Sequence, residues 1–333
     1  MKVLNNKSLM ALIAIVAFAL ALCFSASAQT LAAQLDDKEI PLSEFNSIYV
    51  GDSFEVTLAK GNYGVKLTVD KELAPYVDTY VRSRTLNLSY DAKSVPKEIK
   101  KLYRGRNAIS PVFRAVIYLP ELESVTLADN ASLTGVETFY ADKFSLSVGE
   151  KAMVKSLAVN ARSAYIGARK NAQVIADLQV EGPSEIAVDG NANVKVNANA
   201  PELSVSTGGN SQTSVSGNFI SVNVSSASSS LLSLYSKGEK IAISAEGNSK
   251  ISLTGEADKM VIKTSRNAKL DALSFQVKVV EASMAGSSDA YINVDKFLDV
   301  TLTGGSELLY NGTPEFRIGK IVKSTLAPYG SVR

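Results

Sequence analysis

A short run of turn-forming residues recurs along most of this chain at intervals of about twenty residues. Most copies begin with Asn, continue with Ala or Ser, and end on an apolar residue. A fixed interval of this length is typical of a solenoid, in which each repeat forms one coil and stacks on the next. The copies begin at Asn130, Lys151, Asn171, Asn191, Asn210, Ser228, Asn248, Asn267, Ser288 and Gly305.

Apolar and polar residues alternate on both sides of each turn. In the copy at Asn191, Val194 and Val196 flank Lys195, which predicts a strand with one buried and one exposed face. A repeat of this length is too short for a helical crossover or a propeller blade of about forty residues. A β-sandwich or an up-and-down barrel would instead show hairpin turns about 8–12 residues apart.

We therefore predict an all-β fold, a parallel β-helix or solenoid of about ten coils of roughly 20 residues. Right-handed winding is expected from the general preference of parallel connections. The Ser-rich stretch 204–233 is expected to form thinner coils rather than a linker, because apolar residues continue through it. Its expected inward residues are Val205, Val215, Ile220, Val222 and Val224.

The N-terminal sequence predicts export. Two lysines precede an apolar run over residues 9–24, and an Ala-x-Ala sequence ends at Ala28. This arrangement is typical of a secretory signal peptide, with cleavage after Ala28. A lipoprotein signal at Cys23 is the alternative, disfavoured by the large Leu22 before it. We expect a periplasmic, cell-surface or secreted protein, with no membrane span after residue 28.

Composition excludes several classes of site and partner from the mature chain. The chain has no His or Trp, and its one cysteine lies in the leader. Thiolate and imidazole ligands, disulfides and Ser-His or Cys-His nucleophiles are therefore not expected in the mature chain. Loss of Lys2 and Lys7 with the leader brings the 35 basic residues down to the number of acidic ones, 33. A neutral chain has no general attraction to nucleic acid, so we expect no nucleic-acid partner.

The N-terminal part shows a pattern of strands over residues 45–90, followed by a strand that leads into the first coil. The residues that define this pattern are Phe45, Ile48, Val50, Gly51, Val56, Leu58, Gly61, Val65, Leu67, Val69, Asp70, Leu73, Leu86, Leu88, Val116, Tyr118, Pro120 and Leu122. The pattern resembles the putative auto-transporter adhesin head GIN domain family, common in Bacteroidetes, and the likeness covers most of residues 40–312. The resemblance implies an exported β-helical protein. One departure is the first turn, residues 128–131, where family members carry Ser and Gly.

Four segments are expected. Residues 1–28 form the signal peptide, and residues 39–122 form an N-terminal β segment of the head domain with a basic insert at 91–111. Residues 123–312 form the β-helix repeats, and residues 313–333 form a C-terminal tail.

The recurring asparagines are interpreted as a structural turn ladder. Asn tolerates left-handed backbone geometry, can bond its own turn, and can bond a stacked Asn in the next coil. A ligand-reading row is the alternative, and the structural role is favoured. The ladder residues are Asn130, Asn171, Asn191, Asn210, Asn248 and Asn267.

Acidic residues near the turns do not form a catalytic pattern. Polysaccharide-cleaving enzymes need converging carboxylates or an acidic calcium cluster. Glu150, for example, is followed one coil later by Arg169 and Lys170, which predicts charge compensation on a solvated edge. We expect no catalytic residues, no cofactor and no metal site.

The basic insert is the one candidate ligand contact. A short helix after Ser94 and Pro96 is expected, since Pro suits the first turn of a helix that follows a Ser cap. Such a helix either covers one end of the solenoid or contacts an anionic glycan or lipid headgroup. The candidate residues are Lys97, Lys100, Lys101, Tyr103, Arg104 and Arg106.

The sequence as a whole predicts an exported, non-enzymatic solenoid with a surface rich in Ser, Thr, Asn and Lys. Adhesion or binding at the cell envelope, to a glycan or a partner protein, is the favoured function. A structural role, in which coils stack into homo-oligomers, is the second hypothesis, and a polysaccharide-active enzyme is the third.

Overall fold

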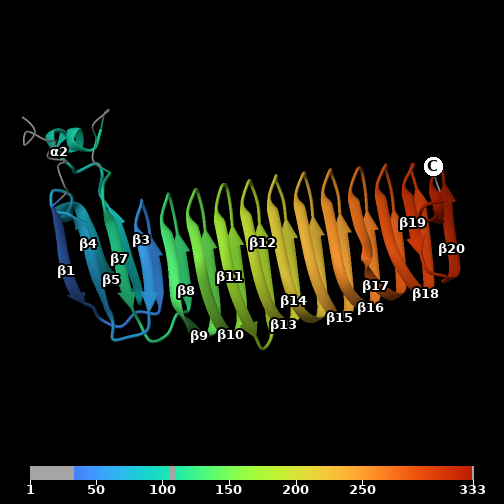
Figure 1. Ribbon diagram of the computed structural model, residues 1–333, viewed down its shortest axis with the longest axis horizontal. Coiled ribbons are helices and arrows are strands. Elements are labelled where there is room, and N and C mark those ends of the chain that lie inside the picture. Colours follow the sequence, from blue (N-terminus) through green and yellow to red (C-terminus); the bar gives the residue numbers. More distant parts are fainter. Residues whose placement is uncertain (1–33, 105–107, 109, 332–333) are drawn as a thin grey trace, which may run out of the picture.

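The computed structural model describes residues 34–104, 108 and 110–331, which form a long stack of strands (Figure 1). The stack is a parallel β-solenoid of about 11 turns, so the predicted fold class is confirmed. The predicted signal peptide lies outside the described residues.

Each coil contributes to two faces of one continuous sheet. Strand β13 (Asn193–Thr207) lies between β14 (Gln212–Ser226) on one side and two shorter strands on the other. Its first half pairs in parallel with β11 (Gln173–Val180), and its second half pairs with β12 (Pro183–Val188). We call the part of the sheet formed by the first halves face A and the part formed by the second halves face B. A corner joins the two halves within a coil, and the turns join one coil to the next.

The other coils repeat this plan, each pairing in parallel with its neighbours. Their strands are β9 (Ser132–Val148), β10 (Met153–Ala168), β15 (Leu231–Ala245), β16 (Lys250–Thr264), β17 (Lys269–Met284), β18 (Asp289–Thr303), β19 (Glu307–Asn311), β20 (Glu315–Val322) and β21 (Thr325–Pro328).

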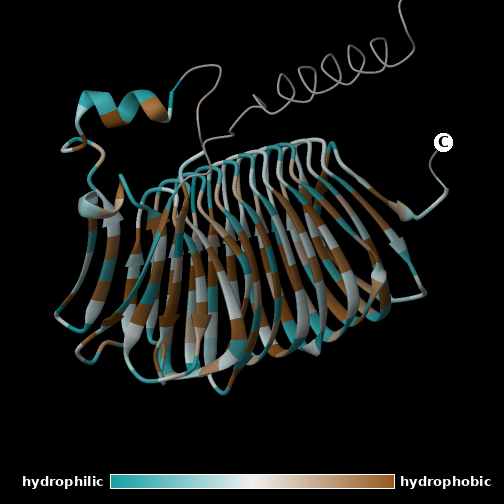
Figure 2. Cartoon of the chain, turned by 60° about the vertical axis from the view of Figure 1, so that its left-hand side comes forward, coloured by the Kyte–Doolittle hydropathy of each residue, from teal (hydrophilic) through white to brown (hydrophobic). Residues whose placement is uncertain are grey.

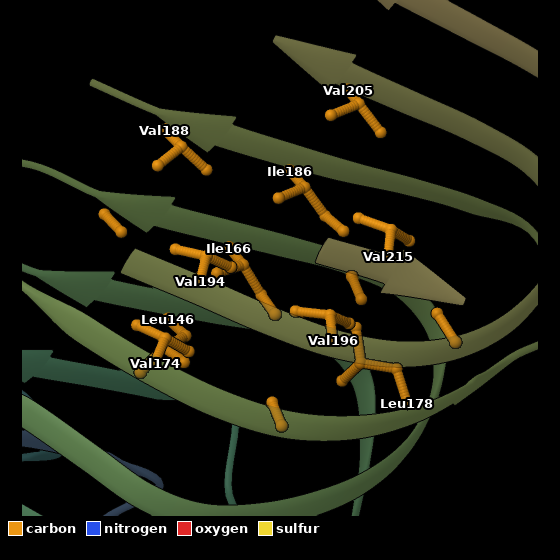
Figure 3. Close-up of a cluster of buried hydrophobic side chains, with 14 of the residues drawn as sticks. Leu146, Ile166, Val174, Leu178, Ile186, Val188, Val194, Val196, Val205 and Val215 are labelled. Atoms are coloured by element: carbon orange, nitrogen blue, oxygen red, sulfur yellow. The ribbon is translucent and has the colours of Figure 1, made fainter. Parts of the chain in front are cut away.

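The core is a column of inward side chains between the two faces. Val194 and Val196 are fully buried, while Lys195 points to solvent. Figure 3 shows both valines among inward residues of neighbouring coils, including Val174 and Leu178. Hydrophobic and hydrophilic residues alternate along the strands throughout (Figure 2). Each fully buried Val, Leu or Ile contributes roughly 1.5–3 kcal/mol to the free energy of unfolding. Stacked apolar rows therefore stabilise every coil through its neighbours.

One inward prediction is wrong. Ile220 is 55% exposed, and the preceding residue, Phe219, is 2% exposed. Inward positions run from Val215 through Gly217 to Phe219 and then resume at Val222. The alternation therefore slips by one residue at the corner, where the chain passes from face A to face B.

The N-terminal segment adds two layers to the same stack. Strand β2 (Ser47–Val50) lies in parallel between β6 (Thr85–Tyr90) and β8 (Ser124–Leu127). Strand β3 (Glu55–Ala59) lies in parallel between β7 (Phe113–Tyr118) and β9. These layers place segments that are far apart in the sequence side by side.

Antiparallel strands close the N-terminal end. Strand β4 (Gly64–Asp70) pairs with β7, β1 (Leu35–Pro41) pairs with β4, and β5 (Val77–Arg82) pairs with β6. A short 3-10 helix, η1 (Ala74–Tyr76), precedes β5. The edge strand β1 carries four charged residues, Asp36 to Glu39, and ends in a proline. These features discourage pairing with another sheet at this end.

The turns correct two details of the sequence prediction. The residue in the left-handed conformation is the one before the recurring Asn, for example Lys170 (φ 60°) and Gly190 (φ 75°). The asparagines therefore do not supply the left-handed backbone. Two repeats are also displaced by one residue, because Ser229 donates its N–H to the Gly209 carbonyl and Leu270 pairs with Ala290. The equivalent positions are Ser229 and Ser287 rather than Ser228 and Ser288.

Candidate functional site

The Asn side chains of the turns contact one another across coils. Asn191 donates from Nδ2 to Oδ1 of Asn171 at 3.2 Å, and Asn210 donates to Asn191 at 3.4 Å. Asn267 makes the same bond to Asn248 at 3.1 Å. Within these pairs the amide groups bond each other, which leaves them less capacity to bond a ligand.

The residue after each Asn is small because it points inward at the turn. Ala172 and Ala192 are fully buried, as are Ser211 and Ser249 in later coils. The turn of one coil lies against the turn of the next: a Cβ added to Gly209 would lie 2.5 Å from the Gly190 carbonyl oxygen. The turn edge is therefore a tightly stacked backbone with little room for a bound molecule.

The basic insert forms helix α2 (Lys97–Leu102) between β6 and β7. It stands where other coils have a tight turn, on the turn edge of the N-terminal layers (Figure 1). The end of the stack is closed by β1, β4 and β5, so α2 does not cover it as the sequence suggested. The helix has no side-chain cap, and Asp91 rather than Ser94 organises the preceding turn, accepting the N–H groups of Lys93 and Ser94.

The structure describes five of the six candidate residues of the insert, and these five differ in exposure. Lys97, Lys101 and Arg104 are exposed, whereas Lys100 is half-buried and donates from Nζ to the Lys93 carbonyl oxygen at 3.3 Å. Arg106 lies outside the described residues.

Tyr103 belongs to the packing of the insert rather than to its solvent face. Its ring is half-buried against the core, together with Ile99. Burial, and next the negative charge of Asp70, raise the pKa of the Tyr103 hydroxyl to about 12. Neutral Tyr103 is thus held in place beside a buried carboxylate.

Acidic side chains near the turns form ion pairs with basic side chains of neighbouring coils. Glu150 forms an ion pair with Lys170 on the next coil, and Asp289 pairs with Lys269 at 3.0 Å. The Glu150–Lys170 pair is exposed, and in the second pair Lys269 is exposed while Asp289 is half-buried, so both pairs contribute little stability. Among the described residues, no group of three or more acidic, His or Cys side chains is placed to hold a metal ion.

Two acids meet at the first turn, where Asp52 is half-buried and Asp129 is exposed. Asp52 accepts the Tyr90 N–H at 2.7 Å, and Asp129 accepts the Asp52 N–H at 3.1 Å. Burial raises the pKa of the Asp52 carboxyl, and the charge of Asp129 acts in the same direction. Both carboxylates bond backbone amides, so the arrangement holds the first turn in place.

Face A carries two outward rows of polar side chains. In one row, Asn197 donates to Asp177 at 2.7 Å and accepts from Ser216 at 2.5 Å. In the next row, Asn199 donates to Gln179 at 3.3 Å and accepts from Asn218 at 3.2 Å. The two rows run along the axis of the rod, across β11, β13 and β14.

Two hollows adjoin at the start of these rows. The larger has a volume of about 520 Å³ and lies at the corner over β9 and β10, and the smaller has about 270 Å³ and lies on face A. Asn160 and Gln179 line both. Acidic side chains line the larger hollow at Glu121, Glu123, Asp142 and Glu181.

An aromatic ring and an arginine complete the larger hollow. Tyr140 is 56% exposed, and the ammonium of Lys60 lies 4.6 Å from its ring centroid. Glu137 accepts the Lys60 N–H at 2.5 Å. Arg162 forms an ion pair with Asp142 at 2.9 Å. The hollow thus combines a ring, amides and carboxylates within a few coils.

The sequence prediction missed these residues. Tyr140, Asn160 and Gln179 occupy equivalent positions in three successive coils. The only sequence signal is the alternation of Asn197 and Asn199 in the following coil, which marks an outward polar row.

No helix in residues 34–104, 108 and 110–331 is both long enough and apolar enough to cross a membrane.

A family model described as "Putative auto-transporter adhesin, head GIN domain" matches residues 44–236 and 177–314. A putative adhesin from Parabacteroides merdae aligns with 19% identity over 89% of this chain and 97% of its own, with a TM-score of 0.36. A putative lipid binding protein from Parabacteroides distasonis aligns with 16% identity over the same shares of the two chains, also with a TM-score of 0.36. A putative adhesin from Bacteroides fragilis aligns with 15% identity over 89% and 98%, with a TM-score of 0.32. No protein with a curated description matches.

Proposed function

Because this chain belongs to the putative auto-transporter adhesin head GIN domain family, we propose that it is an exported, non-catalytic adhesion module of the cell envelope. Its family supports an adhesion or binding role. More specifically, we propose that face A presents its polar rows to a glycan or to a partner protein.

The rows of face A are the observation that carries this proposal. Polar side chains recur at the same two outward positions in β11, β13 and β14: one row is all amides, and the other is a carboxylate, an amide and a hydroxyl. Successive coils lie about 4.8 Å apart. A rigid stack holds these groups at a regular spacing without the entropic cost of ordering a loop. Such a surface suits a ligand that itself repeats.

Export and an envelope location follow from the leader-like sequence of residues 1–28. The test is mass spectrometry of the mature chain from fractionated cells. A chain beginning at Gln29 supports the proposal, and a full-length cytoplasmic chain contradicts it.

Binding is tested with the chain lacking residues 1–28, immobilised and exposed to envelope glycans and to an envelope protein extract. Saturable retention of one component supports the proposal. Absence of retention from both sets would contradict it. Incubation with the same glycans, followed by product analysis, tests the non-catalytic part, which cleavage would refute.

Assembly is the second candidate function, favoured by the C-terminal end of the described stack. Strand β20 is exposed along its whole length, with Phe316 at 43% and Ile318 at 56% exposed. These side chains lie beside Leu298 and Val300 of the preceding coil, which are fully buried. Among the described residues, no layer covers the inward side chains of β20, and an open edge of this kind pairs readily with another strand.

The occupant proposed for this edge is a second copy, joined through the same edge in a two-fold symmetric, antiparallel β20–β20 contact. The charged edge of β1 disfavours the opposite end. Sedimentation at increasing concentration should show a dimer, and Ile318→Lys should abolish it. Ile175→Lys is the control, because Ile175 is 49% exposed in the middle of face A. A monomer at all concentrations would exclude the assembly role.

A further inference from the structure

We propose that the two adjoining hollows form one groove that binds an uncharged, linear oligosaccharide along the axis of the rod. We call it the coil groove and define it by Tyr140, Asn160, Arg162, Gln179 and Asn199. The proposal rests on the proposed binding function and names its site and ligand class.

The groove has the right direction for an extended chain. Its lining comes from equivalent positions in successive coils, because Tyr140 pairs with Asn160, Asn160 with Gln179, and Gln179 with Asn199. Each step along the groove is one strand spacing, about 4.8 Å. This step is close to the repeat of one pyranose residue along an extended glycan. Successive sugars therefore meet side chains at equivalent positions of successive coils.

The lining groups match sugar hydroxyls. Gln179 and Asn199 bond each other at 3.3 Å, and an amide with two N–H donors and two lone pairs keeps part of its capacity after one such bond. Asn160 adds a third amide, and the carboxylates of Glu123 and Glu181 accept hydrogen bonds. A hydroxyl both donates and accepts, so it satisfies either kind of group. Sites for small ligands typically combine a few such convergent polar groups with an apolar surface.

Tyr140 supplies the apolar surface. Its side chain is 56% exposed at the corner, where a sugar ring can lie against it. Lys60, whose ammonium lies 4.6 Å from the ring centroid, and Glu137, which holds the Lys60 backbone, restrain the ring from one side. A ring already held in place loses little entropy on binding.

The charge of the groove disfavours an anionic glycan, although the Lys60 ammonium lies beside Tyr140. Four carboxylates line the larger hollow, and the single arginine there is paired with Asp142 at 2.9 Å. A uronate or sulfate would meet like charges, which costs binding energy. The coil groove therefore takes a neutral ligand, in contrast to the basic insert around α2.

Titration calorimetry with the chain lacking residues 1–28 tests the proposal. The probes are cellohexaose, xylohexaose, mannohexaose and chitohexaose, with oligogalacturonate as the anionic comparison. We expect saturable binding of at least one neutral probe, with an affinity that changes little between low and high salt. Tyr140→Ala and Gln179→Ala should each weaken it about tenfold, equivalent to ~1.4 kcal/mol.

The control variant is Glu185→Ala. Glu185 is exposed on face B of the coil that carries Gln179, so its loss should leave the affinity unchanged. All variants are compared by circular dichroism to establish that they fold.

Three outcomes overturn the inference. If no neutral probe binds, the coil groove is not a glycan site, although retention of an envelope protein would still support the proposed function. Binding that Tyr140→Ala and Gln179→Ala do not weaken places the glycan elsewhere on the rod. Preferential binding of oligogalacturonate contradicts the charge argument.

Discussion

Replacing Phe219 by Ala should be one of the most damaging single changes in the middle of the rod. The side chain is 2% exposed and fills the corner of its coil. Its partner on the preceding strand is Ala200, and Gly217 lies beside its ring, with an added Cβ at 3.0 Å from Cζ. These small neighbours cannot move in to fill the space that the ring leaves.

The magnitude follows from burial and from this lack of relaxation. Removing a fully buried Phe side chain loses roughly 1.5–3 kcal/mol of transfer free energy. A cavity that does not collapse raises the total loss to about 4–5 kcal/mol, the upper part of the range for Phe→Ala. Ile220→Ala, one residue later and 55% exposed, should cost less than about 1 kcal/mol.

Urea unfolding followed by circular dichroism measures the difference. Phe219→Ala should lower the midpoint strongly with an unchanged slope, and Ile220→Ala should barely move it. Phe219→Leu should recover most of the loss, because it restores most of the buried volume. If Ile220→Ala costs as much as Phe219→Ala, the assignment of the inward row at this corner is wrong.

Three further changes test the turns, the close contacts of the backbone and the insert. Gly255→Ala should cost more than about 3 kcal/mol, because a Cβ there would lie 2.0 Å from the Ser236 carbonyl oxygen at φ 121°. Gly149→Ala, with nothing nearer than 4.0 Å, should be neutral in the same urea assay, and equal losses would contradict this. Asn191→Ala should lower the free energy of unfolding by about 0.5–1 kcal/mol, because it removes two exposed hydrogen bonds between side-chain amides. No loss relative to wild type in thermal unfolding would contradict a stabilising ladder. The folded state favours neutral Tyr103. The contribution of Tyr103 to the free energy of unfolding is therefore complete below pH 10 and is lost as the pH rises through about 12. Tyr103→Phe should weaken this alkaline loss in pH-dependent unfolding, and an unchanged profile would contradict it.

The sequence predicted the coils because strand alternation and a regular turn are local properties. Val194, Val196 and Lys195 lie as expected, since they stand well within one strand. Ile220 was misplaced because the alternation slips at the corner, and the position of the slip depends on how the chain bends around Phe219. The recurring Asn was assigned the left-handed conformation because Asn tolerates it, whereas the preceding residue adopts it.

The layers of the N-terminal part could not be predicted from the order of strands. Strand β2 lies between β6 and β8, which come much later in the chain. The run from Ala115 to Leu119 is apolar at successive positions, so alternation does not define its inward face. The structure buries Ala115, Ile117 and Leu119.

The coil groove was hidden from the sequence for a related reason. Strands β9 and β10 change register twice between Val154 and Ala158. Counting residues from the turn therefore does not bring Tyr140, Asn160 and Gln179 into one row. Their alignment depends on these irregularities, which no simple repeat predicts.

The absence of Trp from this chain allows a direct test of the coil groove. Tyr140→Trp places a single indole in the groove, and Tyr80→Trp places one on β5, where Tyr80 is 49% exposed at the N-terminal end. Titration with the neutral hexasaccharides should shift or quench the emission of the Tyr140→Trp variant and leave that of the Tyr80→Trp variant unchanged. An unchanged Tyr140→Trp signal, or an equal response from both variants, would contradict glycan binding in the groove.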